Sequence, residues 1–119
     1  MRNVRGVGAS PGRAAGVLVH TKDGLKAHAG QPFVFVCVEG TRDDADAIRA
    51  SVAVVSLRGG LTGDAAILAR ALGKPCVVSC PHLEIVSGVL RLRGAEPLAV
   101  PEGTEASVDG AKGELELAF

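Results

Sequence analysis

The hydrophobic positions of this chain fall in short runs and not in long stripes. Residues 32–38, 52–57 and 76–80 are apolar and rich in β-branched side chains, and each run is too brief for a helix. Runs of this kind are typical of strands that are buried on both faces of a parallel sheet. Residues 32–38 form the most continuous run, so we expect this strand at the centre of the sheet.

Helix signals fill the gaps between these runs. Thr41 is followed by Asp43 and Asp44, an order that caps a helix and places acids in its first turn, and it predicts a helix over residues 42–50. Strong helix formers then fill residues 65–72, between the second and third apolar runs. The order of strand, helix and strand favours parallel pairing.

The two ends of the chain have a different pattern. Residues 89–93 and 114–117 alternate between apolar and charged side chains, which predicts half-exposed strands. Near the N-terminus we expect a strand over residues 16–20, entered by a glycine-rich turn at residues 6–12 that lacks the spacing of a nucleotide-binding loop. Residues 21–31 are polar and predict a surface loop or a short helix. Together these elements indicate an α/β fold of sheet and helix layers.

Size and charge narrow the function. The 119 residues are 47% apolar, enough for one domain over residues 1–119. The formal net charge is zero and aromatic residues make up 3%, so neither charge nor stacking surfaces favour a nucleic acid or an anionic membrane as partner. No apolar run reaches the length of a membrane span or of a signal-peptide core, and we therefore expect a cytoplasmic protein.

The cysteines and histidines indicate no metal site. Cys37, Cys76 and Cys80 lie within or beside apolar runs, which favours buried free thiols. On one extended strand Cys76 and Cys80 would lie about 13 Å apart, too far to share a zinc ion. His20, His28 and His82 are scattered without neighbouring ligands, and we expect all of them to be incidental.

The segment that joins the second and third apolar runs has the strongest functional signal. Glycines open a turn, Thr62 is a candidate N-cap, and Asp64 falls in the first turn of the helix, which Gly73 and Pro75 terminate. The N–H groups at the start of such a helix attract phosphate or carboxylate. The turn, with Gly59, Gly60, Thr62 and Gly63, is therefore a candidate anion site.

The same segment resembles a known motif. Residues 58–75 are similar to the phosphohistidine motif of the swivelling, or mobile, domain of phosphoenolpyruvate-utilising enzymes, whose pattern is Gly-Gly-x-Thr-Ser-His-Ala-Ala followed by two apolar residues and Ala-Arg. Residues 8–19 and 108–115 are similar to the opening and closing segments of that domain. Within the family the chain looks most like the pyruvate, phosphate dikinases.

The resemblance implies a three-layer β/β/α sandwich and a site for phosphoryl groups. In the family, the histidine carries a phosphoryl group between a nucleotide site and a phosphoenolpyruvate or pyruvate site on neighbouring domains. Arg58 and Arg70 match family positions and are candidates to hold an anion. The resemblance also implies partner domains, and it places Mg²⁺ and ATP or phosphoenolpyruvate on those domains, with no cofactor bound by this domain alone.

One departure from the motif affects the chemistry directly. Where the family has Ser-His, this sequence has Gly63 and Asp64. Neutral imidazole is a good phosphoryl acceptor, whereas a carboxylate repels the incoming phosphates and normally needs a metal ion and a cationic helper. Asp64 can also be an ordinary first-turn acid that stabilises its helix.

Two functions remain open from the sequence. The first is a degenerate domain that has lost its carrier residue and serves as a binding or regulatory module. The second is a working phosphotransfer component of a larger enzyme, with the phosphoryl group accepted at Asp64 or Thr62. In either case the partners are nucleotide-binding and phosphoenolpyruvate- or pyruvate-binding domains or a separate protein, because this chain has no nucleotide-binding or barrel pattern of its own.

Overall fold

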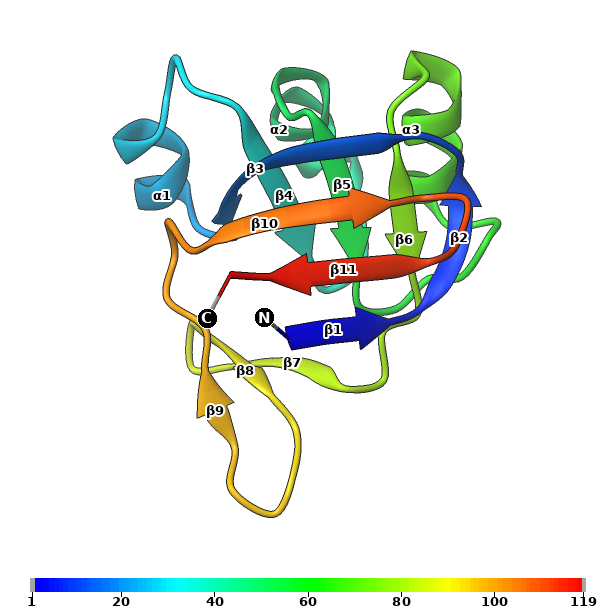
Figure 1. Cartoon of the computed structure of the whole chain (residues 1–119). Helices are drawn as coiled ribbons and strands as arrows, with labels where there is room; N and C mark the ends of the chain where they lie inside the picture. The colour runs from blue at the N-terminus through cyan, green and yellow to red at the C-terminus, as the bar shows by residue number, and fades with distance from the viewer. Residues whose placement is uncertain (1, 119) are drawn as a thin grey trace.

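Four parallel strands with intervening helices form the centre of the fold (Figure 1). The computed structural model describes residues 2–118. The strands are neighbours in chain order and pair in parallel. They are β3 (Arg13–Val19), β4 (Phe33–Cys37), β5 (Ala53–Ser56) and β6 (Cys76–Val78). The helices that connect them are α1 (Lys22–Ala27), the 3₁₀ turn η1 (Arg42–Asp44) with α2 (Ala45–Ala50), and α3 (Asp64–Leu72).

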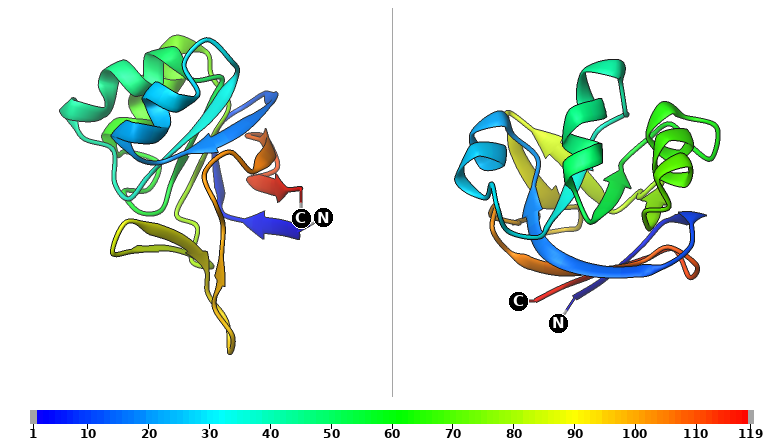
Figure 2. Two further views of the ribbon diagram at one scale, coloured as in Figure 1. Left: turned by 90° about the vertical axis from the view of Figure 1, so that its left-hand side faces the viewer. Right: turned by 90° about the horizontal axis from the view of Figure 1, so that it is seen from above.

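Antiparallel strands extend this sheet at both edges and form a second layer. β10 (Glu105–Asp109) pairs with β3, β11 (Glu114–Leu117) with β10, and β1 (Arg2–Arg5) with β11, while β2 (Val7–Ser10) pairs with β6 at the other edge. A separate small sheet contains β7 (Leu83–Val86), β8 (Val89–Leu92) and β9 (Leu98–Ala99). The helices cover one face of the parallel strands and β10, β11 and β1 lie on the other (Figure 2). The predicted β/β/α sandwich is confirmed.

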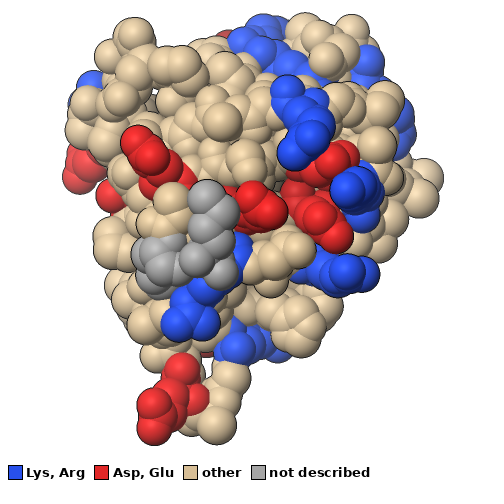
Figure 3. All heavy atoms as spheres, in the orientation of Figure 1, with Lys and Arg blue, Asp and Glu red and all other residues tan. Residues whose placement is uncertain are grey.

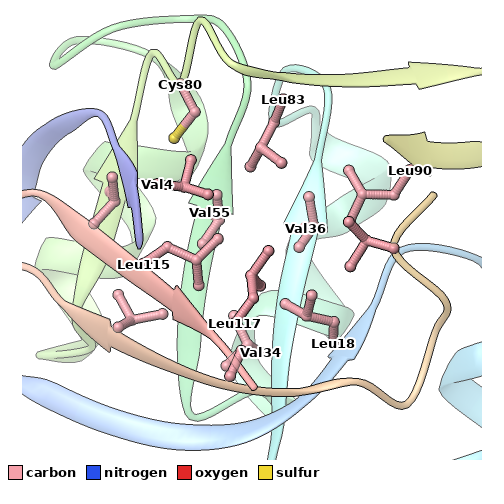
Figure 4. Packing of buried hydrophobic residues seen from close by; sticks show 14 of the residues in the cluster. Val4, Leu18, Val34, Val36, Val55, Cys80, Leu83, Leu90, Leu115 and Leu117 are labelled. Atoms are coloured by element: carbon pink, nitrogen blue, oxygen red, sulfur yellow. The ribbon is translucent and has the colours of Figure 1, made fainter. Parts of the chain in front are cut away.

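The central strand β4 contributes side chains to both hydrophobic cores. All five of its residues are buried, as the sequence predicts. Phe33 and Phe35 face the helices, whereas Val34 and Val36 face the antiparallel layer, because side chains alternate along a strand. Figure 4 shows the core on the antiparallel side. Its labelled members are Val4, Leu18, Val34, Val36, Val55, Cys80, Leu83, Leu90, Leu115 and Leu117.

The two edges of the eight-stranded sheet meet at Gly6. β1 and β2 follow each other in the chain yet lie at opposite ends of the strand order, so the sheet must curl until its edges touch. The Gly6 N–H donates to the carbonyl of Gly113 over 2.9 Å. A Cβ at Gly6 would lie 2.6 Å from the carbonyl oxygen of Val78, and Cβ atoms at Gly8 and Gly110 would be closer still to backbone oxygens. We call Gly6, Gly8, Gly110 and Gly113 the glycine seam.

Several predicted boundaries change. The predicted turn at residues 6–12 is wrong in part, because residues 7–10 form β2, where the glycines permit close backbone packing and do not break the strand. The strand expected over residues 16–20 occupies Arg13–Val19. The run at residues 76–80 ends as a strand at Val78, since Ser79 has a left-handed φ of 54°. The predicted helix over residues 42–50 is present, with a 3₁₀ first turn.

None of the helices in residues 2–118 has the length and apolar composition of a membrane span.

Glu102 joins the end of β3 to the start of α1. Its carboxylate accepts hydrogen bonds from the backbone N–H groups of His20 and Thr21 (2.8 and 3.0 Å) and from the Thr21 hydroxyl (2.6 Å). The His20 ring is 5% exposed; its Nε2 lies 3.0 Å from the carbonyl oxygen of Gly88, and its Nδ1 lies 3.8 Å from the Glu102 carboxylate. Burial alone would raise the pKa of Glu102, but these hydrogen bonds and His20 together lower it below the ordinary value of a glutamate. His20 is expected from the sequence to be incidental, but its buried ring lies between Gly88 and Glu102 and contributes to the packing there.

The glycine seam gives the first prediction. We expect Gly8→Ala to lower the free energy of unfolding by about 2 kcal/mol or more, because its Cβ would press on the carbonyl of Gly110. Chemical denaturation monitored by circular dichroism measures this loss. Gly94→Ala is the matched control, since a Cβ there meets no atom within 4 Å. Equal stabilities of the two variants would contradict the role of the seam.

The Glu102 contacts give a pH prediction. Because the folded state lowers the pKa of this carboxyl, its contribution to stability is fully present above the unfolded pKa and is lost as pH falls through the folded pKa. We expect Glu102→Gln to be less stable near neutral pH and to lose less stability on acidification than the wild type. Denaturation midpoints across the acidic range test this, with Glu96→Gln on an exposed loop as the control. Parallel profiles for wild type and Glu102→Gln would show the prediction to be wrong.

Candidate functional site

The candidate motif begins where β5 ends. The N–H groups of Leu57 and Arg58 donate to the carbonyls of Cys37 and Val38 over 2.9 and 2.7 Å, so the backbone stays fixed to β4 up to Arg58. Gly59 and Gly60 then adopt φ values of 102° and 62°, a region that favours glycine. These glycines reverse the chain and lead it into α3.

Helix α3 starts at Asp64, and its N-cap is Gly63. Gly63 has an extended backbone (φ −70°, ψ 161°) and supplies no side-chain cap. The predicted N-cap, Thr62, is therefore wrong: it lies one residue too early to reach the first helical N–H groups and is exposed. A Cβ at Gly63 would lie 2.7 Å from the carbonyl oxygen of Gly59, so the tight turn itself requires glycine there. The predicted C-cap, Gly73, is confirmed with a left-handed φ of 68°.

Asp64 presents an exposed carboxylate at the first residue of α3. The helix dipole favours a negative charge at this position. Within residues 2–118, no Lys, Arg or His side chain forms an ion pair with Asp64. The site therefore has an acid at the helix start without a paired cation.

The two candidate arginines lie in different surroundings. The Arg70 guanidinium donates to the carbonyl of Leu61 over 2.7 Å and to the carbonyl of Ala9 over 3.2 Å, so it fastens the motif loop to β2. Arg58 lines a pocket of about 350 Å³ between the end of β5 and strand β7. The structure thus places Gly59, Gly60, Thr62, Gly63 and Asp64 on one loop and helix start, with Arg70 as its tether.

The pocket beside Arg58 contains charged residues that sequence patterns did not single out. Glu84 on β7 accepts a hydrogen bond from Arg91 over 2.6 Å, and its other carboxylate oxygen lies 3.1 Å from Arg93 Nε. Glu84 and Arg91 are direct partners in the β7–β8 pairing. The alternation at residues 89–93 predicts the positions of Arg91 and Arg93 on one face of a strand, but only the strand register shows which acid they face.

The three thiols are buried and free, as predicted. Burial raises the pKa of Cys37 and of Cys76 to about 12 and that of Cys80 to about 11, so these thiols stay protonated and unreactive near neutral pH. Cys76 belongs to the core under the helices and Cys80 to the core under the antiparallel layer. Among residues 2–118, no cluster of His, Cys, Asp and Glu is arranged to hold a metal ion.

Most of the chain matches a known family of protein domains. Residues 29–113 match the family described as PEP-utilising enzyme, mobile domain. Pyruvate, phosphate dikinase 1, chloroplastic, of Oryza sativa subsp. japonica is 36% identical over 112 residues, which cover 92% of this chain and 12% of the relative. The pyruvate, phosphate dikinase of Clostridium symbiosum is 34% identical over 110 residues, which cover 90% of this chain and 12% of the relative. The chain thus corresponds to a small part of these relatives.

A solved structure shows the same fold at low identity. Thermococcus kodakaraensis aconitase X in its holo-form superposes with a TM-score of 0.59 and 16% identity, and the match covers 100% of both chains. At this identity the likeness concerns the fold alone.

The Arg70 tether gives a prediction for the motif loop. We expect Arg70→Met to lower the free energy of unfolding by about 1 kcal/mol, because the carbonyls of Leu61 and Ala9 lose a charged donor. Amide hydrogen exchange in the loop at residues 59–63 should become faster at the same time. Arg49→Met on α2 is the control, since Arg49 makes only an exposed pair with Asp46. Unchanged exchange in Arg70→Met would contradict the tether.

Proposed function

This chain belongs to the family of PEP-utilising enzyme mobile domains, and from that membership we propose that it is a degenerate swivelling domain that acts as a binding or regulatory module. In this proposal Asp64 stands at the position of the family's phosphohistidine and supplies a fixed negative charge. The domain docks on a partner without carrying a phosphoryl group.

The surroundings of Asp64 carry the proposal. A carboxylate accepts a phosphoryl group only if nearby cations offset the repulsion between it and the donor phosphates. Asp64 has no ion-pair partner in the described part of the chain, and Arg70 donates to backbone carbonyls beside it. This domain alone therefore offers little to help phosphorylation of Asp64.

The surface around Asp64 supports docking of another protein domain. Leu61 and Ile67 are 48% and 51% exposed, so two large apolar side chains close to Asp64 in the chain are open to contact with a partner. Ile67 lies three residues after Asp64, so both side chains share one face of α3. Nucleotide-binding and phosphoenolpyruvate- or pyruvate-binding domains, or a separate protein with such a site, are the proposed partners, and Mg²⁺ with ATP or phosphoenolpyruvate would reach this domain only through them.

The alternative function is a working phosphotransfer component. Phosphorylation of Asp64 would give an acyl phosphate, and phosphorylation of Thr62 would give a phosphate ester. The exposed position of Thr62 beside the helix start favours this second acceptor. A partner that supplied Mg²⁺ and a cationic side chain would remove the obstacle at Asp64.

Intact-mass spectrometry distinguishes the two functions. The protein is first incubated with Mg²⁺, with ATP or phosphoenolpyruvate, and with the separated catalytic domains of a pyruvate, phosphate dikinase. The wild type is compared with Asp64→His and with the double variant Gly63→Ser, Asp64→His. The single variant is needed because a Cβ at residue 63 would lie 2.7 Å from the Gly59 carbonyl oxygen, so that the loop must shift. We expect phosphorylation of a histidine variant and none of the wild type.

Two outcomes would contradict the proposal. A gain of one phosphoryl group by the wild type would establish the working component, and Asp64→Asn and Thr62→Val would then identify the acceptor. Failure of both histidine variants, with the dikinase's own mobile domain phosphorylated in parallel, would mean that this scaffold does not dock in the family's manner.

A further inference from the structure

The pocket beside Arg58 lies at the carboxyl ends of three parallel strands. Val38 follows β4, Leu57 and Arg58 follow β5, and Cys80 follows β6. Strand β7 closes the opposite side. Ligands of α/β sheets bind outside the carboxyl ends of the strands, where the loops converge on a rigid scaffold. The residues that line the pocket include Val38, Leu57, Arg58, Glu84, Ile85 and Arg93.

The lining combines an apolar wall with excess positive charge. Leu57 and Leu83 are buried in the core below, Ile85 packs against the same core, and Val86 is exposed. Glu84 is within ion-pair distance of both Arg91 and Arg93, so this single acid is opposed by more than one cation. In residues 2–118 the Arg58 guanidinium forms no ion pair. The pocket thus contains an arginine that has no ion-pair partner among the described residues.

The rest of the surface makes this local excess notable. The chain has a formal net charge of zero, and basic and acidic side chains lie side by side on the face shown in Figure 3. A small anion is therefore attracted by the groups of a particular site and not by the protein as a whole. Arginine is well suited to this task, because its planar guanidinium binds carboxylate or phosphate through two parallel hydrogen bonds.

We infer that this pocket binds a small organic anion, with its carboxylate or phosphate group on Arg58 and a short apolar body against Val38, Leu57 and Ile85. The volume of about 350 Å³ lies at the small end of the range for ligand pockets, which suits a compact molecule. Asp64 is not among the residues that line the pocket, so the inference does not depend on whether the domain carries a phosphoryl group.

Titration of the ¹⁵N-labelled chain, followed by amide chemical shifts, tests the inference with four probes. Isovalerate and isobutyl phosphate combine an anion with an apolar body and compare the two head groups. Isovaleramide has the body without the charge, and inorganic phosphate has the charge without the body. We expect saturable shifts at residues 57–58 and 80–86 with at least one of the first two probes, and weaker binding of isovaleramide and inorganic phosphate.

Variants locate the site. Arg58→Gln should weaken binding about tenfold, in line with the loss of a charged hydrogen-bond pair, and Arg49→Gln on α2 should leave it unchanged. Asp64→Asn should also bind as the wild type does. The inference is overturned if none of the probes produces localised, saturable shifts, if Arg58→Gln binds as tightly as the wild type, or if Asp64→Asn removes binding and so moves the anion to the start of α3.

Discussion

Contact between backbones at the glycine seam is the constraint on which the rest of the structure depends. A sheet that contains both β1 and β2 at its ends can close only if the chain crosses itself without side chains in between. At Gly6 and Gly113 the crossing is hydrogen-bonded, and at Gly8 and Gly110 there is no room for a Cβ. Because the edges meet, the antiparallel layer is pulled over the parallel strands, and one core forms on each side of β4.

The central unit of the fold could be predicted because its signals are local. Continuous apolar runs identify β4 and β5. A run of strong helix formers that ends at Gly73 identifies α3. The opening strand β2 could not be predicted in this way. Gly8 in this strand is required because the backbone of Gly110, about a hundred residues later in the chain, packs directly against it. In the sequence alone, a glycine-rich stretch is equally typical of a turn. The N-cap of α3 at Gly63 could not be predicted for a similar reason, since the close packing of Gly63 against Gly59 exists only in the folded loop.

The candidate site shows the same division. Asp64 and the glycine turn are contiguous in the chain, so the motif alone located them. The different surroundings of Arg58 and Arg70 could not be predicted from the sequence. Those of Arg70 depend on its contact with Ala9 in β2, and those of Arg58 depend on the strand pairing that places Glu84 opposite Arg91. Both arginines match family positions and are therefore predicted to hold an anion, whereas the fold makes Arg70 a tether of the loop and Arg58 a residue of a pocket.

The pairing of β1 with β11 also determines how the domain can move. Arg2 lies opposite Leu117, so β1 and β11 are neighbours in the antiparallel layer, and Figure 1 shows α3 in the layer beyond the parallel strands. Where such a domain is joined to a longer chain at both ends, the two connections leave from almost one point and act as a single pivot. The rest of the domain is then a rigid lever, and a modest rotation about that pivot carries the start of α3 through a wide arc while neither core is disturbed.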